Sequence, residues 1–183
     1  VGAFVKSDPV LDRPDLQFPC LPVTGDLDAA MAGEKSKLSP WPGLTLGPNV
    51  LRPASRGRVN LASADPLAIP AIVHNWVEAR EDQHLSLRAM RMARELVAAP
   101  SLAPLVASEP WPGKDCQSDD ELLDYAHRFG NTGYHPVGTC RMGNDQGAVL
   151  DPQLRVRGVA GLRVIDASVM PRLVSGNTNA AAI

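Results

Sequence analysis

The sequence lacks features that define several classes of protein. It contains no apolar run near the roughly 20 residues that a membrane-spanning helix needs, and it has no internal repeat. Lysine and arginine total 18 against 20 acidic residues, which gives a formal net charge of −2. A chain without excess positive charge does not attract a phosphate backbone, which argues against nucleic acid as a partner.

Cysteine is also scarce, and its placement argues against two kinds of site. The three cysteines, Cys20, Cys116 and Cys140, lie far apart and are odd in number. They fit neither a disulfide framework nor a CxxC metal site. We expect buried free thiols, which favour a reducing compartment such as the cytoplasm. The sequence also contains no GxGxxG, the fingerprint of a dinucleotide-binding domain.

The residues that are present suit a single globular domain. The chain has 183 residues, of which 44% are hydrophobic, enough for a proper core. Its 17 prolines predict many irregular, extended stretches. The chain opens on Val1 rather than Met, and the helix-forming residues 179–183 stop abruptly. We therefore expect both ends to be internal to a longer protein, with the final helix missing.

Turn-forming residues dominate the first part of the chain. Residues 5–50 are rich in Pro, Gly and Asp and predict a meandering segment. Within it we expect short strands at residues 16–18 and 44–46, and a mobile polar loop at residues 25–38.

Two helices follow from apolar periodicity. Asp82 is suited to cap a helix at 83–99, and its apolar residues recur at helical spacing: Leu85, Ala89, Met92, Ala93 and Leu96. Residues 118–121 read Ser-Asp-Asp-Glu, a capping box that should open a helix at 118–129. That helix should bury four side chains and end at Gly130: Leu122, Leu123, Ala126 and Phe129.

Strands are predicted on both sides of these helices. Alternation in Arg58–Leu61 indicates a half-buried strand, and the apolar run Ile69–Trp76 indicates an extended or edge strand because it contains a proline. Further strands are expected at 154–157 and 162–165. Strands, then helices, then strands predict an α+β fold with a largely antiparallel, multi-stranded sheet and flanking helices.

Two short segments contain the residues best suited to chemistry. His135 precedes a proline, and two glycines follow within eight residues, which indicates a shaped loop presenting an imidazole. A lone histidine of this kind is more often structural than catalytic. The second segment runs from Asp166 through Pro171 to Ser175-Gly176-Asn177-Thr178-Asn179, a small-residue loop entering a helix. Its simplest reading is a helix capped by Asn177 or Asn179.

Taken together, the two segments resemble a known family. His135-Pro-Val-Gly-Thr-Cys-Arg-Met-Gly143, Gly161-Leu-Arg-Val-Ile-Asp-Ala-Ser168 and Gly176-Asn-Thr-Asn179 resemble the C-terminal block of glucose-methanol-choline (GMC) oxidoreductases. Upstream, Pro53-Ala-Ser-Arg-Gly-Arg-Val59 is similar to the entry into that family's substrate domain. The resemblance runs from about residue 50 to the end and is most like the choline-dehydrogenase-like branch.

The resemblance implies a function and a set of residues. The family binds FAD and oxidises alcohols by passing hydride to the flavin. Its active-site pair falls on His135 and Asn177, and the segments that lie against FAD fall on Asp166, Ala167 and Asn179. Residues 1–183 would then be the C-terminal substrate and catalytic domain, with the N-terminal FAD-binding domain as a missing partner. A small-molecule alcohol is the expected substrate, and self-association of the isolated chain is expected.

Three other functions stay open at this point. Without its FAD domain, the chain could be a non-catalytic binding or structural domain. A hydrolase could pair Ser55 or Ser175 with His135, although neither serine lies in a GxSxG elbow. A zinc site on His135 and Cys140 lacks further ligands at suitable spacing.

Overall fold

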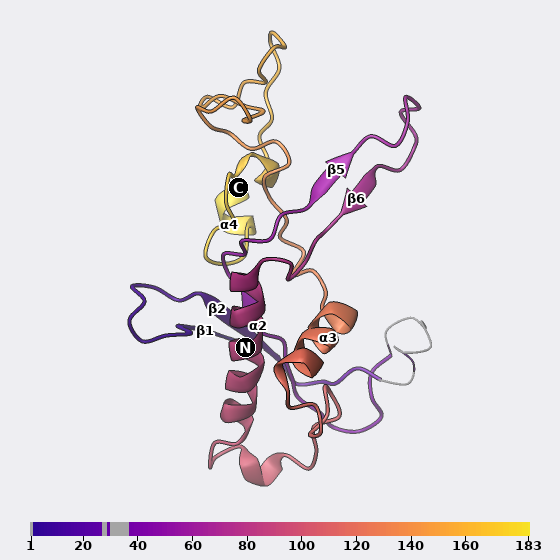
Figure 1. Ribbon diagram of the computed structural model, residues 1–183, viewed down its shortest axis with the longest axis vertical. Coiled ribbons are helices and arrows are strands. Elements are labelled where there is room, and N and C mark those ends of the chain that lie inside the picture. The colour runs from indigo at the N-terminus through magenta and orange to yellow at the C-terminus, as the bar shows by residue number, and fades with distance from the viewer. Residues whose placement is uncertain (1, 27–28, 30–36) are drawn as a thin grey trace. The chain divides into compact units, whose positions relative to one another are not determined.

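The computed structural model describes residues 2–26, 29 and 37–183 (Figure 1). The chain divides into two compact units, each made of two segments. Unit 1 combines Val1–Val50 with Gln83–Gly130, and unit 2 combines Leu51–Asp82 with Asn131–Ile183. The mobile loop predicted at 25–38 lies mostly outside the described residues, but Gly25 and Leu38 at its ends form an isolated antiparallel bridge.

Unit 1 contains a small antiparallel sheet centred on one strand. The strands are β1 (Gly2–Val5), β2 (Leu16–Leu21), β3 (Thr45–Leu46) and β4 (Asn49–Val50). All three others pair antiparallel with β2. Leu16 and Phe18 alternate along β2 toward the core and are 0% and 2% exposed. The strands predicted at 16–18 and 44–46 are confirmed, whereas β1 was not predicted.

The helix α2 (Arg80–Val97) supplies the other side of this core. Ala89 is buried with Leu16 and Phe18, and Leu85, Met92 and Ala93 pack against them. The apolar repeat therefore predicted the face that packs on this core, apart from its last residue. Leu96 is exposed, whereas the unpredicted Leu87 is buried.

The predicted cap of this helix is wrong. The helix begins at Arg80, so Asp82 lies inside its first turn. The buried Asp82 carboxylate instead accepts the backbone N–H groups of Ala54 and Ser55, at 2.8 and 2.7 Å. An aspartate carboxylate can accept N–H groups either at a helix cap or from a distant loop. The sequence alone therefore does not distinguish the two roles of Asp82.

The helix α3 (Asp119–Phe129) begins as its sequence predicts. Ser118 is the N-cap, and its hydroxyl accepts the Glu121 N–H while the Glu121 carboxylate accepts the Ser118 N–H. Gly130 follows as the C-cap, with its N–H donated to the Ala126 carbonyl. Leu122 is fully buried, but Phe129 is exposed rather than buried and packs edge-on against Trp111.

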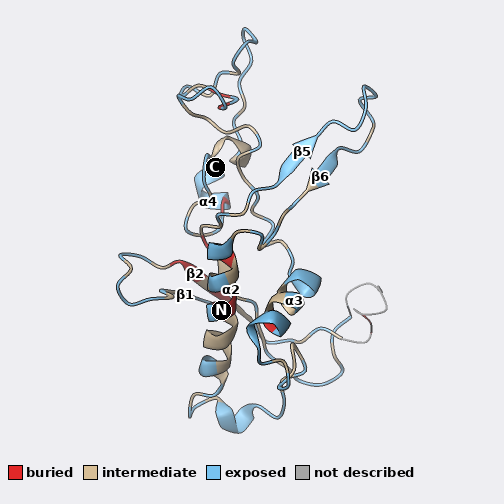
Figure 2. Cartoon of the chain, viewed as in Figure 1, coloured by how far each residue is buried: buried red, intermediate tan, exposed pale blue. Residues whose placement is uncertain are grey.

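Unit 2 opens with a hairpin of two exposed strands. β5 (Arg58–Asn60) and β6 (Ala71–Val73) pair antiparallel, at the positions predicted. Every residue of β5 is exposed, so the expectation of a half-buried strand is wrong for this chain (Figure 2).

The strands predicted at 154–157 and 162–165 are present only as single bridges, between Leu150 and Val156 and between Arg155 and Arg163. Leu154, Gly158 and Gly161 have positive φ angles of 63°, 80° and 73°. That backbone conformation lies outside the β region and breaks a strand. The described residues thus form small antiparallel sheets with few helices, compatible with the α+β class but not with one large sheet. None of the helices described here is long and apolar enough to cross a membrane.

Candidate active site

The loop that presents His135 is held by main-chain hydrogen bonds to a short helix, η2 (Ala167–Val169). The N–H groups of Gly138 and Cys140 both donate to the Ser168 carbonyl, at 3.1 Å each, and the Met142 N–H donates to Val169. Gly138 has a φ of 93°, a conformation that glycine adopts without strain. The two segments singled out from the sequence therefore lie side by side.

Asp166 organises the start of η2. It is the N-cap, and its carboxylate accepts the Ser168 N–H at 2.8 Å. The hydrogen bonds from Ser168 lower the pKa of Asp166, because they stabilise the ionised form. The side chain is exposed, so a carboxylate is available at the surface of this segment.

His135 contacts two consecutive residues of the second segment. Its Nε2 lies 2.7 Å from Asn177 Nδ2, and its Nδ1 lies 2.9 Å from Thr178 Oγ1. His135 and Asn177, which the resemblance pairs, thus lie in contact across 42 positions of sequence. His135 is half-buried, Asn177 is exposed, and Thr178 is buried at 7% exposure. No sequence signal singled out Thr178 beyond its place between two asparagines.

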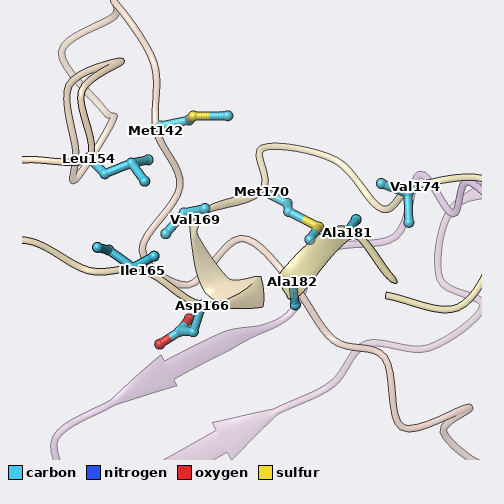
Figure 3. A pocket seen from close by; sticks show the side chains of 9 residues that line it. All are labelled: Met142, Leu154, Ile165, Asp166, Val169, Met170, Val174, Ala181 and Ala182. Carbon is cyan, nitrogen blue, oxygen red and sulfur yellow. The ribbon is translucent and has the colours of Figure 1, made fainter. Parts of the chain in front are cut away.

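A small pocket of about 270 Å³ adjoins these segments (Figure 3). Its lining is apolar except for Asp166: Met142, Leu154, Ile165, Val169, Met170, Val174, Ala181 and Ala182. Of the three residues predicted to lie against a cofactor, Asp166 lines the pocket and Ala167 follows it in η2. The third, Asn179, begins α4 (Asn179–Ala182), whose Ala181 and Ala182 line the pocket. Thr178, not Asn177 or Asn179, is the N-cap of α4.

An ion pair holds the loop beyond His135. Arg141 donates two hydrogen bonds to the carboxylate of Asp145, at 2.8 and 2.6 Å. This bidentate pairing lowers the pKa of Asp145 far below its ordinary value. Arg157 donates to the Gly143 carbonyl at 2.7 Å, so the loop is held from both sides by guanidinium groups.

The contacts of the described residues do not favour the hydrolase or the zinc site. Ser55 Oγ accepts the Ala79 N–H, and Ser175 Oγ accepts a hydrogen bond from Arg52, so each hydroxyl serves a local contact. Within the part of the chain that the structure describes, no three His, Cys, Asp or Glu side chains gather as metal ligands.

The site is an imidazole–amide pair on segments that adjoin an apolar pocket. The family description GMC oxidoreductase matches residues 53–183, and the chain belongs to this family.

Relatives with assigned names agree with this family. The chain is 43% identical over 182 residues to an alcohol dehydrogenase [acceptor] of Pseudomonas putida, covering 100% of this chain and 32% of the relative. It is 38% identical to an oxygen-dependent choline dehydrogenase of Yersinia pseudotuberculosis, covering 100% of this chain and 31% of the relative. The chain thus spans about a third of the length of these proteins.

Solved structures show the same fold. A pyridoxine 4-oxidase from Mesorbium loti matches 99% of this chain and 35% of its own, with a TM-score of 0.81 and 25% identity. An FAD-dependent oxidoreductase from Chaetomium thermophilum matches 93% of this chain and 26% of its own, with a TM-score of 0.72 and 28% identity.

Proposed function

We propose that residues 1–183 are the C-terminal substrate and catalytic domain of an FAD-dependent enzyme that oxidises an alcohol by hydride transfer to the flavin. His135 accepts the hydroxyl proton, and Asn177 holds the substrate oxygen. The observation that carries this proposal is the 2.7 Å contact between His135 Nε2 and Asn177 Nδ2. The names of the relatives, an alcohol dehydrogenase and a choline dehydrogenase, support the reaction class.

The chemistry of this pair matches a hydroxyl group. An alcohol gives up hydride readily only after its hydroxyl proton leaves, and a neutral imidazole can accept that proton. The oxygen then carries negative charge, which an amide N–H stabilises without competing as a base. A hydroxyl that replaces the direct contact of the two side chains would donate to Nε2 and accept from Nδ2. The pair therefore offers the one acceptor and one donor that this group needs.

The residues around the pocket fit a flavin. The pocket wall is apolar, as the face of an aromatic ring system requires, and the carboxylate of Asp166 is the charged group beside it. We propose that Asp166, Ala167 and Asn179 lie against FAD, largely through main-chain groups. When bound, FAD supplies the hydride acceptor.

The remaining parts of the enzyme are proposed to lie outside these residues. The chain has no GxGxxG and covers only 32% of its P. putida relative, so the main FAD-binding domain is a missing partner. The fragment alone should then be inactive. The thiols of Cys20, Cys116 and Cys140 are unpaired and half-buried, which supports a cytoplasmic location.

The activity is tested in the flavin-loaded enzyme that contains this chain. Choline and a series of simple primary alcohols are mixed with the enzyme anaerobically, and flavin bleaching is followed by stopped flow. We expect His135→Ala to slow flavin reduction by about 10²–10⁴-fold, the usual loss for a general base, with FAD content retained. Reduction at the parent rate in a folded His135→Ala variant would overturn the proposed role.

A second function is the non-catalytic one, in which the isolated chain is only a binding or structural domain. Visible absorbance separates the two readings. If the native protein that contains this chain is a yellow flavoprotein, the enzyme is supported. If the native protein consists of these residues alone and lacks flavin absorbance, the binding domain is supported.

A further inference from the structure

Thr178 uses its hydroxyl in an unusual way for its position. It is the N-cap of α4, and its carbonyl accepts the N–H groups of Ala181 and Ala182. A threonine at an N-cap normally accepts a helix N–H with its side chain. Here the side chain makes no capping hydrogen bond. Its oxygen instead lies 2.9 Å from Nδ1 of His135, a residue 43 positions away.

The two shorter contacts of the ring assign its proton, and they outweigh a third, longer one in which the Thr178 N–H points at Nδ1 from 3.4 Å. Asn177 Nδ2 is an amide N–H donor, so Nε2 of His135 accepts through its lone pair. A neutral imidazole carries one proton, which then resides on Nδ1. Thr178 Oγ1 is the acceptor nearest to that N–H, and it lies in a buried position where an unmade hydrogen bond is costly.

We propose that Thr178 is a positioning residue that selects the tautomer of His135 with its proton on Nδ1. This inference rests on the proposed role of His135 as proton acceptor. In that tautomer the lone pair is on Nε2, on the side of Asn177 where the substrate oxygen is proposed to bind. The consecutive residues Asn177 and Thr178 therefore fix both the orientation of the ring and the nitrogen that accepts the proton.

The main chain explains why losing the hydroxyl matters. The backbone N–H of Thr178 lies 3.4 Å from the same Nδ1. An N–H group can only donate, so without the hydroxyl it becomes the polar neighbour of Nδ1 and favours an unprotonated Nδ1. The ring proton then moves to Nε2, and Nε2 can no longer accept a proton from an alcohol.

The test compares three variants of the flavin-loaded enzyme. Thr178→Val keeps the β-branched shape and removes the hydroxyl, whereas Thr178→Ser keeps the hydroxyl. Thr45→Val is the matched control, because it removes a hydroxyl that donates to the Val23 carbonyl within unit 1. Flavin reduction by choline or a simple primary alcohol gives the limiting rate and the apparent Kd separately.

We expect Thr178→Val to lower the limiting rate by about 10–100-fold, the range seen when a metal-bound histidine loses the hydrogen-bond partner of its other ring nitrogen. The apparent Kd for the alcohol should stay within about twofold of the parent, because the hydroxyl does not touch the substrate. Thr178→Ser and Thr45→Val should both reduce their flavin within about threefold of the parent rate.

Nitrogen NMR of histidine-labelled enzyme reads the tautomer directly. The parent should show a protonated Nδ1 and an unprotonated Nε2 for His135, assigned by loss of the signals in His135→Gln. Thr178→Val should reverse this pattern. The inference is overturned if Thr178→Val keeps the parent rate or the parent tautomer. It is also overturned if Thr178→Ser is as slow as Thr178→Val, because that result indicates a packing role for Thr178. If His135→Ala itself is not slowed, the proposed function fails instead.

Discussion

The side chains of Asn177 and Thr178 divide the work of holding one imidazole. Asn177 is exposed and reaches Nε2, whereas Thr178 is buried and reaches Nδ1. Neighbouring residues in an irregular segment point in different directions, so one can face a substrate while the other faces the protein. Substitution of Asn177 should change transition-state stabilisation, and substitution of Thr178 should change the tautomer of the His135 ring.

The proposed active-site pair should behave as a unit. We expect Asn177→Ala to slow flavin reduction by about 10²–10³-fold, as for loss of one oxyanion donor. The double variant with His135→Ala should lose little more than the larger single loss, because both side chains act on one oxygen. Stopped-flow flavin reduction measures all three variants. Losses that multiply would show that the two residues act independently.

Asp82 is the other residue whose substitution should have a large effect. Asp82→Asn replaces one of the two carboxylate oxygens that accept the Ala54 and Ser55 N–H groups with an amide donor. We expect a cost of about 1–3 kcal/mol, because a buried N–H loses its acceptor. Thermal unfolding measures the cost. Glu81→Gln, at an exposed position one residue earlier, is the control and should unfold like the parent.

At the scale of secondary-structure elements, the start of α3 depends on an ionised carboxylate. The Glu121 carboxylate accepts the N–H groups of Gln117 and Ser118, at 3.0 and 2.9 Å. Hydrogen bonds from Ser118, and then from Gln117, hold the pKa of Glu121 below its ordinary value of 4.5. A lowered carboxyl pKa means that the stabilisation is fully present above pH 4.5 and is lost as the pH falls further below it.

This sign predicts how a neutral substitution behaves. Glu121→Gln should weaken protection of residues 118–129 against hydrogen exchange near neutral pH, and the difference from the parent should shrink below about pH 4.5. Rates are compared after correction for the intrinsic pH dependence of exchange. Asp120→Asn is the control variant, because it removes a carboxylate of the same turn that is not part of the capping box. A pH-independent difference for Glu121→Gln would contradict the prediction.

The sequence predicted elements best where one local pattern decided the outcome. The capping box and apolar residues located α3, and the alternation in Arg58–Leu61 located β5. The strand at 154–157 failed because Leu154 has a positive φ angle in a turn where its N–H donates to the Asp151 carbonyl, a conformation that strand propensity does not indicate. The strand at 162–165 is present only as the bridge between Arg155 and Arg163. The pairing of His135 with Asn177 followed from family resemblance alone. The contact of Thr178 with His135 depends on an N-cap residue whose side chain makes no capping hydrogen bond.

For the whole chain, exposed apolar side chains are the most telling feature. Leu61, Leu67 and Ile69 lie on the β5–β6 hairpin and its connecting loop and are 90%, 90% and 84% exposed. A soluble monomer seldom leaves an apolar patch of more than a few hundred Å² uncovered. These exposed side chains of unit 2 fit the proposal that the FAD-binding domain is a missing partner.

The isolated 183-residue chain should therefore self-associate. We expect sedimentation velocity to show species larger than a monomer that increase with concentration, because burial of these side chains against another copy removes them from water. A Leu61→Asp, Ile69→Asp double variant should shift the distribution toward monomer, whereas Leu105→Asp tests whether any exposed leucine has the same effect. A clean monomer at high concentration would contradict the proposal.

The interleaving of the two units also limits how this chain can be divided or recombined. The family match begins at residue 53, but unit 1 takes its sheet from residues before 51 and most of α2 from residues after 82. A chain trimmed to the matched region would leave Ala89 without Leu16 and Phe18, its partners in the core. The border that sequence comparison draws therefore cuts through a folding unit. A chimera between relatives should keep native packing only if residues 1–50 and 83–130 come from the same parent.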